Sequence, residues 1–154
     1  MKKVEITAFD LAKRFVGVKE VKGIVDNPQI MAMLQLDDDW PQHDEVPWCS
    51  GFANYICWLL KLPRSHSLAA ISWETVGRRI TIEEAVIGFD LVVIKRGTGT
   101  QRHVTFFGGI VGERFIGLGG NQDNQVKIST YAISDITAVI RVYGDEDADD
   151  NKDT

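Results

Sequence analysis

In the first half of the chain, apolar residues recur every three or four positions, which predicts amphipathic helices. One helix is expected after the N-cap Thr7, ending at Gly17, and a second after Asn27, which precedes a proline suited to a first helical turn. A shorter helix is expected over residues 67–77. Between these lies the most apolar helix, which starts at residue 47 or 48, ends before Pro63 and holds both cysteines.

From residue 90 onward, apolar residues alternate with polar ones or form short runs bounded by glycine, which is typical of β-strands. The runs are separated by short turns, so that neighbouring runs can pair as antiparallel hairpins. Strands are therefore expected at residues 91–95, 103–111, 114–118 and 136–143. Helices followed by an antiparallel sheet predict an α+β domain.

The composition supports one domain followed by a charged end. The chain has 154 residues, of which 44% are hydrophobic, which is enough for one core and too little for two. Six acidic residues and one lysine between positions 145 and 154 account for the net charge of −5. A like-charged, apolar-poor segment cannot offset its ordering entropy. We therefore expect a single domain over residues 1–143 and an acidic, disordered tail over 144–154.

Several classes of function are excluded by what the pattern lacks. The basic residues are scattered and form no stripe with aromatic residues, so nucleic acid is not an expected partner. The apolar runs fall well short of the roughly 20 residues of a membrane span, and the first residues lack the apolar region of a signal peptide. We expect a protein made in the cytosol, without stable membrane association and monomeric.

The two cysteines, Cys49 and Cys57, could form a disulfide, bind a metal, pack in the core or supply a nucleophile. Eight residues along one helix separate their Cα atoms by about 12 Å, beyond the roughly 7 Å that a disulfide allows. Two thiols without C-x-x-C spacing make a poor zinc site, and the acidic run 37–39 lacks the EF-hand pattern, so no metal or cofactor is expected. Core packing and nucleophile remain.

The position of Cys49 at the start of the helix favours the nucleophile. A helix N-terminus lowers the pKa of a thiol because its N–H groups and dipole stabilise the thiolate. Cys57 lies more than two turns into the helix among apolar residues, so we interpret it as a core residue.

His103, at the head of a predicted strand, is the candidate base for this thiol. It shares a strand face with Thr105 and Phe107, and on the helix-facing side it could meet the cysteine. A half-exposed strand histidine without function is an equally good interpretation. His43 and His66 lie in polar segments, whose composition explains them without catalysis.

A third residue is expected to hold the imidazole in one orientation, as Asn, Asp or Glu does in cysteine proteases. The segment GGNQDNQ at residues 119–125 follows the next strand and offers Asn121, Gln122, Asp123 and Asn124. We choose Asn121 because it comes first after the strand. An ordinary turn would have the same composition.

Four motifs in order, PWCSGF, GFDLVV, HVTFFGG and GLGGNQDNQV, resemble the NlpC/P60 and CHAP superfamily of cysteine peptidases, and in particular small phage and prophage cell-wall hydrolases. The resemblance implies a papain-like fold in which the cysteine helix packs on an antiparallel sheet. It also implies catalytic roles for Cys49, His103 and Asn121. Arg102 stands where that family commonly has glycine before the histidine.

The resemblance implies a peptidoglycan hydrolase of the phage endolysin type, a cysteine endopeptidase or N-acetylmuramoyl-L-alanine amidase that needs no cofactor. Such an enzyme would stay in the host cytoplasm until released to the cell wall. A cell-wall-degrading effector toxin and a non-catalytic virion or binding module of the same fold are the alternatives. The bond cut, amide or peptide, stays open, with a slight preference for a peptide bond.

Overall fold

The computed structural model describes residues 5–21, 27–37 and 48–144. The predicted acidic tail beyond Gly144, most of the acidic run 37–39, and His43 lie outside the described residues. The helices are α1 (Ala8–Lys13), α2 (Pro28–Leu34) and α3 (Cys49–Leu59), with 3-10 turns η1 (Ala70–Thr75), η2 (Ile82–Glu84) and η3 (Ile133–Asp135). The strands are β1 (Arg78–Ile80), β2 (Asp90–Lys95), β3 (Arg102–Val111), β4 (Arg114–Gln122), β5 (Gln125–Ala132) and β6 (Ile136–Arg141).

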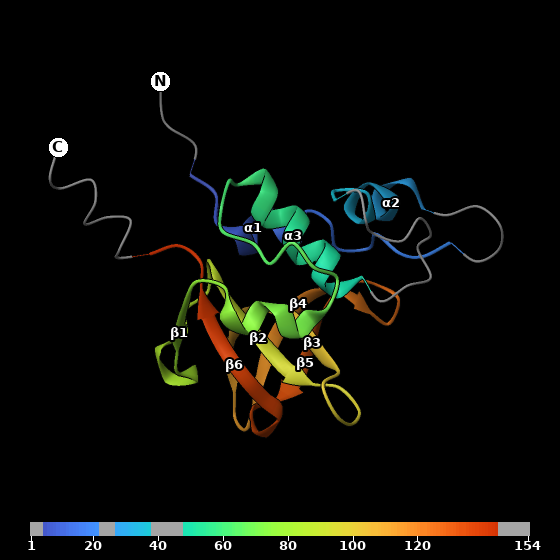
Figure 1. The fold of residues 1–154 in the computed structure, drawn as a ribbon. Coiled ribbons are helices and arrows are strands. Elements are labelled where there is room, and N and C mark those ends of the chain that lie inside the picture. The colour runs from blue at the N-terminus through green and yellow to red at the C-terminus, as the bar shows by residue number, and fades with distance from the viewer. Residues whose placement is uncertain (1–4, 22–26, 38–47, 145–154) are drawn as a thin grey trace, which may run out of the picture.

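The strands form one antiparallel sheet in the order β1-β6-β2-β3-β4-β5. Helices α1, α2 and α3 gather on one side of this sheet, as Figure 1 shows, and α3 packs on β3 and β4. This arrangement confirms the α+β prediction of a cysteine-bearing helix on an antiparallel sheet. Within the described residues, no helix is long and apolar enough to cross a membrane.

Alternation along β3 divides its side chains between two clusters. Val104 and Phe106 belong to the main core between the helices and the sheet. Phe107 belongs to a second cluster on the other face, which also holds Ile94 of β2 and Phe115 of β4. Residues 103, 105 and 107 therefore face away from the helical layer, a point that matters for the histidine.

The first two helices begin where the sequence predicts. The Thr7 hydroxyl accepts a hydrogen bond from the Asp10 backbone N–H at the start of α1, and the Asn27 side chain does the same for Gln29 at the start of α2. The helix expected over 67–77 is instead the 3-10 turn η1 over six residues. The hydroxyls of Ser72 and Thr75 bond backbone carbonyls three residues back, which competes with a regular α-helix.

The sheet is larger than expected. β5 was not predicted, because its residues alternate between exposed and half-buried positions and only Val126 is fully buried. β1 has three residues, too few to show a period. β4 continues through residues 119–122, beyond the end predicted for it at residue 118. The two glycines there have no side chains to show alternation, and a side chain on Gly120 would collide with Trp48 and Phe52 of the helical layer.

Candidate active site

Cys49 is the first residue of α3, and its thiol is buried and free of any disulfide. The N-cap residue Trp48 makes no capping hydrogen bond with its side chain; its indole N–H donates instead to the Glu20 carboxylate at 2.7 Å. A helix end of this kind keeps its first backbone N–H groups available to negative charge near Cys49.

His103 is the second residue of β3, and only 5% of its surface is exposed. It lies on the strand face of Thr105 and Phe107, which is the face away from the helical layer. The imidazole nonetheless interacts with the Cys49 thiol, because the sulfur sits at the beginning of β3, where the Val104 backbone also hydrogen-bonds to it. The structure thus brings together two distant residues that the sequence analysis paired.

Gln122, the last residue of β4, is the residue that holds the imidazole. Its Oε1 lies 3.0 Å from His103 Nε2 and also accepts a hydrogen bond from the Thr105 hydroxyl at 3.0 Å. Its Nε2 donates to the backbone carbonyls of Gly117 at 3.2 Å and Lys127 at 2.6 Å. These bonds fix the Gln122 amide with its oxygen toward His103, and an amide oxygen can only accept a hydrogen bond. We therefore assign the proton of this contact to His103 Nε2, which leaves Nδ1 to face the thiol.

Asn121, the residue chosen from the sequence, lies at an irregularity of β4. The pairing of β4 with β5 shifts register between Gly119 and Gln122, and Asn121 has a left-handed φ of 56°. In a regular strand, residue 121 would share the face of Gly117 and Gly119, where Thr105 lies. The bulge moves Gln122 to that face instead, so the described hydrogen bond to the imidazole comes from Gln122, and a catalytic role for Asn121 stays a prediction.

Burial and pairing act in opposite directions on the two reacting groups. Burial raises the pKa of the Cys49 thiol, but the hydrogen bond and charge of His103, with help from the Val104 backbone and Arg96, bring that pKa below the ordinary 9.0. Burial lowers the pKa of His103, but the hydrogen bond and charge of Cys49 and the hydrogen bond to Gln122 bring it above 6.5. Each group therefore shifts the pKa of the other toward the charged form, as a thiol nucleophile and its base require.

Tyr131 of β5 is a further neighbour of the imidazole that the sequence analysis missed. Its hydroxyl lies 3.3 Å from His103 Nε2, and the two ring centroids are 5.5 Å apart. Burial and the nearby charge of Cys49 raise the pKa of this phenol, so it stays protonated. Because β5 itself was not predicted, nothing in the sequence connected Tyr131 with His103.

A polar network under α3 holds the helix that carries Cys49. The buried Ser50 hydroxyl donates to the Ser67 carbonyl and accepts from the Trp73 indole N–H at 2.8 Å. The buried Asn54 side chain joins the same network through the Ser50 carbonyl and the His66 backbone N–H. A Ser one position and an Asn five positions after the cysteine on an apolar helix could have signalled these contacts, since buried polar groups need partners.

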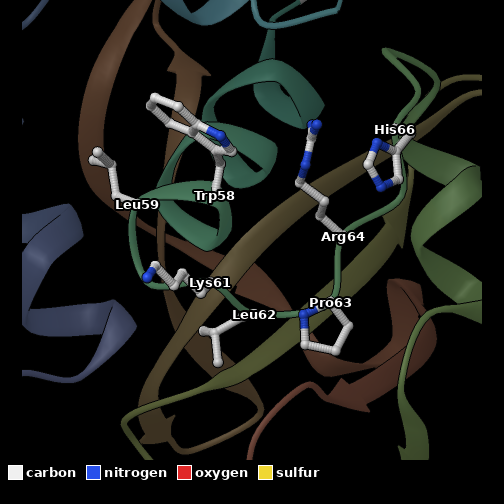
Figure 2. Close-up of a pocket in the computed structure, with 7 residues that line it drawn as sticks. All are labelled: Trp58, Leu59, Lys61, Leu62, Pro63, Arg64 and His66. Atoms are coloured by element: carbon white, nitrogen blue, oxygen red, sulfur yellow. The ribbon is translucent and has the colours of Figure 1, made fainter.

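His66 lies at a separate pocket near the C-terminal end of α3. Figure 2 shows this pocket, which is lined by Trp58, Leu59, Lys61, Leu62, Pro63, Arg64 and His66. The His66 ring is 3.9 Å from the Asp37 carboxylate, which also pairs with Arg64. The structure therefore brings His103, and not His66, to Cys49. Over residues 5–21, 27–37 and 48–144, no group of three or more His, Cys, Asp or Glu residues could hold a metal ion.

No family model and no curated protein matches the chain. Solved structures do resemble it. The peptidoglycan hydrolase RipB from Mycobacterium tuberculosis superposes with a TM-score of 0.54 and 18% identity, over 90% of this chain and 64% of that one. The P60 domain of an antigen from M. avium subspecies paratuberculosis superposes with a TM-score of 0.53 and 15% identity, over 90% of this chain and 96% of that domain. NlpC1 from Trichomonas vaginalis superposes with a TM-score of 0.56 and 15% identity, over 94% of this chain and 47% of that one.

These similarities establish the fold. The chain has the α+β architecture of NlpC and P60 proteins, and it corresponds in extent to the isolated P60 domain. It spans less than two thirds of RipB and about half of NlpC1. At such low identity the likeness speaks for architecture, so the chemistry must be argued from the side chains of this chain.

Proposed function

We propose that this protein hydrolyses an amide or peptide bond of bacterial peptidoglycan, with Cys49 as nucleophile and His103 as base. The observation that carries the proposal is the buried Cys49–His103 pair, in which each group shifts the pKa of the other toward the charged form. The pair lies on a fold shared with the peptidoglycan hydrolase RipB, which indicates the substrate class.

The proposed reaction is acyl transfer in two steps. His103 has accepted the thiol proton at Nδ1, and the Cys49 thiolate attacks the carbonyl carbon of the scissile amide. Backbone N–H groups at the start of α3 are suited to stabilise the oxyanion. The tetrahedral intermediate collapses as the imidazolium gives its proton to the leaving amine, which leaves a thioester on Cys49.

The thioester is then hydrolysed by water. His103, now neutral, takes a proton from the water as it attacks the thioester carbonyl, and the second intermediate releases a carboxylic acid and restores the thiolate–imidazolium pair. Gln122 takes no part in the bond changes. It keeps the imidazole oriented with Nδ1 toward the sulfur throughout both steps, because its amide is fixed by Thr105 and two backbone carbonyls.

Mass spectrometry of a peptidoglycan digest tests the substrate and the bond together. We expect new amino groups and new carboxylic acids with intact glycan strands, and a slight preference for a peptide bond over the amide after muramic acid. New reducing sugar ends would contradict the thiol mechanism, since glycosidic cleavage typically uses a pair of carboxylates. The Cys49→Ala protein serves as the matched control and should release nothing.

The proposed biological setting is that of a phage endolysin, which the order of the four sequence motifs supports. Expression inside a bacterium should leave the cells intact until the inner membrane is permeabilised, after which lysis should follow. Lysis without permeabilisation, or none after it despite activity on purified peptidoglycan, would argue against this setting and leave the effector toxin as the better alternative.

A non-catalytic module of the same fold is the competing interpretation. It makes no use of a buried cysteine and histidine that shift each other's pKa toward the charged form, whereas a cysteine hydrolase requires such a pair. Treatment with iodoacetamide at neutral pH should modify Cys49 and abolish peptidoglycan hydrolysis. An unreactive Cys49 in the folded protein would favour the non-catalytic module.

A further inference from the structure

Arg96 acts on the reacting pair through its charge and takes no part in the bond changes described above. It follows β2, in which Ile94 pairs directly with His103 of β3. The Arg96 backbone N–H continues this pairing with a 3.1 Å hydrogen bond to the Gln101 carbonyl. Because side chains two residues apart in a strand share a face, Arg96 lies on the face of Ile94 and His103, just beyond the histidine.

The charge of Arg96 reaches the site. This charge lowers the pKa of the Cys49 thiol, although burial, His103 and the Val104 backbone each have a larger effect on that pKa. The same charge counteracts the rise in the pKa of His103. Arg96 is exposed, and within the described part of the chain no carboxylate lies within ion-pair distance of it. The Asp123 carboxylate is paired with Lys127.

Arg102, the residue that departs from the glycine of the resembling family, supports the hairpin that carries Arg96. Its Nη1 donates to the carbonyls of Gly99 at 2.8 Å and Gln101 at 3.0 Å. It pairs with Lys95 in register, so its side chain leaves the strand on the face opposite His103, toward Glu74. Arg102 thus leaves the side of the imidazole open and fixes the loop between Arg96 and Gln101.

We propose that Arg96 binds a free carboxylate of the substrate close to the scissile amide, so that the enzyme selects peptides that carry this negative charge. The inference rests on the proposed function. A guanidinium at the edge of the site can form two parallel hydrogen bonds with a carboxylate, which a neutral carboxamide accepts far less well. Recognition at this position would orient the substrate amide over Cys49 before attack.

The experiment compares two substrates and three proteins. Purified peptidoglycan is used as isolated and after its carboxylates have been converted to carboxamides with carbodiimide and ammonia. Initial rates of release of soluble peptide are measured at low substrate for the wild type, Arg96→Gln and Arg114→Gln. Arg114 is an exposed arginine at the opposite end of β4 from Gln122, about 26 Å away at the rise of a strand.

We expect the wild type and Arg114→Gln to hydrolyse the native substrate about tenfold or more faster than the amidated one, as befits a hydrogen bond to a charged group. In Arg96→Gln the ratio of the two rates should fall to near one. This ratio is insensitive to any general change in the reacting pair, because both substrates meet the same thiol and imidazole. Arg96→Lys should restore part of the preference, since it keeps the charge but not the fork.

Two results would overturn the inference while leaving the proposed function intact: equal rates of the wild type on both substrates, or an Arg96→Gln protein that keeps the wild-type ratio. If the folded wild type releases nothing from either substrate, the proposed function itself fails, and the role of Arg96 fails with it.

Discussion

At the scale of single residues, the two thiols of α3 differ because of what surrounds them. Cys57 is fully buried among apolar neighbours, and burial raises the pKa of its thiol to about 12. Cys49 is nearly as buried, yet its pKa falls below 9.0 because His103 supplies a hydrogen bond and a positive charge. Of the two thiols, only Cys49 therefore has surroundings that stabilise its thiolate.

The first prediction compares the two cysteine variants. Cys49→Ala should abolish peptidoglycan hydrolysis, and Cys57→Ala should keep most of it while losing some free energy of unfolding, because it leaves a small cavity. Hydrolysis assays and chemical denaturation of both proteins provide the comparison. Equal losses of activity in two folded variants would contradict the assignment of Cys49.

The second prediction concerns the pH dependence of alkylation. Because the pKa of Cys49 is lowered, its thiolate persists at pH values where an ordinary thiol is protonated, and alkylation by iodoacetamide should decline only as the pH falls through that lowered pKa. His103→Ala removes the main cause of the lowering, so its alkylation curve should move to higher pH. The rate of Cys49 modification, followed by mass spectrometry, gives both curves. An unshifted curve in His103→Ala would remove the basis for the pair.

The third prediction separates Gln122 from Asn121. Gln122→Ala removes a hydrogen bond to the imidazolium, so turnover should fall about 10- to 100-fold. The same bond raises the pKa of His103, so its loss should also move the alkaline limb of the pH–rate profile to lower pH. Asn121→Gly, which suits the left-handed φ at that position, should lower turnover less. A more damaging Asn121→Gly would restore the prediction made from sequence.

At the scale of secondary-structure elements, the site depends on how closely α3 approaches β4. A Cβ atom on Gly120 would lie 2.6 Å from Phe52 Cβ and 2.7 Å from the Trp48 ring. A Cβ on Gly119 would lie 2.6 Å from Gln122 Oε1. The two glycines therefore allow the cysteine helix and the glutamine to sit against the same segment of β4.

The fourth prediction is that Gly120→Ala disturbs the site through this contact. It should lower the free energy of unfolding by about 1–3 kcal/mol, as overpacking does, and it should slow alkylation of Cys49 because α3 is displaced. Gly112→Ala is the matched control. Its Cβ would meet nothing within 4 Å, so it carries only the strain of a φ of 60° in the turn between β3 and β4. Gly112→Ala should lower the free energy of unfolding without changing the rate of Cys49 alkylation. A similar loss of alkylation rate in both variants would contradict the proposed effect of the contact between Gly120 and α3.

At the scale of the whole molecule, one buried ion pair joins the middle of the sheet to its last strand. Asp90 begins β2 and pairs in register with Arg141 at the end of β6. The carboxylate accepts from Arg141 Nε at 2.9 Å and Nη2 at 3.0 Å, and from the Val86 backbone N–H at 2.8 Å. Both side chains are largely removed from water, 1% exposed for Asp90 and 15% for Arg141.

The fifth prediction tests this pair against an exposed one. Asp90→Asn leaves the buried guanidinium without its countercharge and should lower the free energy of unfolding by about 3 kcal/mol. Asp123→Asn is the matched change in the exposed pair with Lys127 and should cost less than about 1 kcal/mol. Urea denaturation of the two variants gives the comparison. Comparable losses would mean that the Asp90–Arg141 pair contributes no more than a surface pair.

The sequence by itself determined the parts of this protein that depend on neighbours along the chain. The caps at Thr7 and Asn27, the helix that begins at Cys49 and the strand that carries His103 all follow from local hydrogen bonds and from the period of apolar residues. The interpretation of Cys57 as a core residue follows from its place more than two turns into the helix among apolar neighbours, and the structure buries it.

Only the tertiary structure decided which side chains meet. The period of a strand gives two faces but not which one is inner, so the face on which His103 lies stayed open. A single bulge reverses the faces beyond it, and for that reason Gln122 and not Asn121 reaches the imidazole. Tyr131 meets the imidazole, and Arg96 joins the hairpin that carries His103, through pairing between strands. Such pairing depends on contacts between residues far apart in the sequence, which no local pattern records.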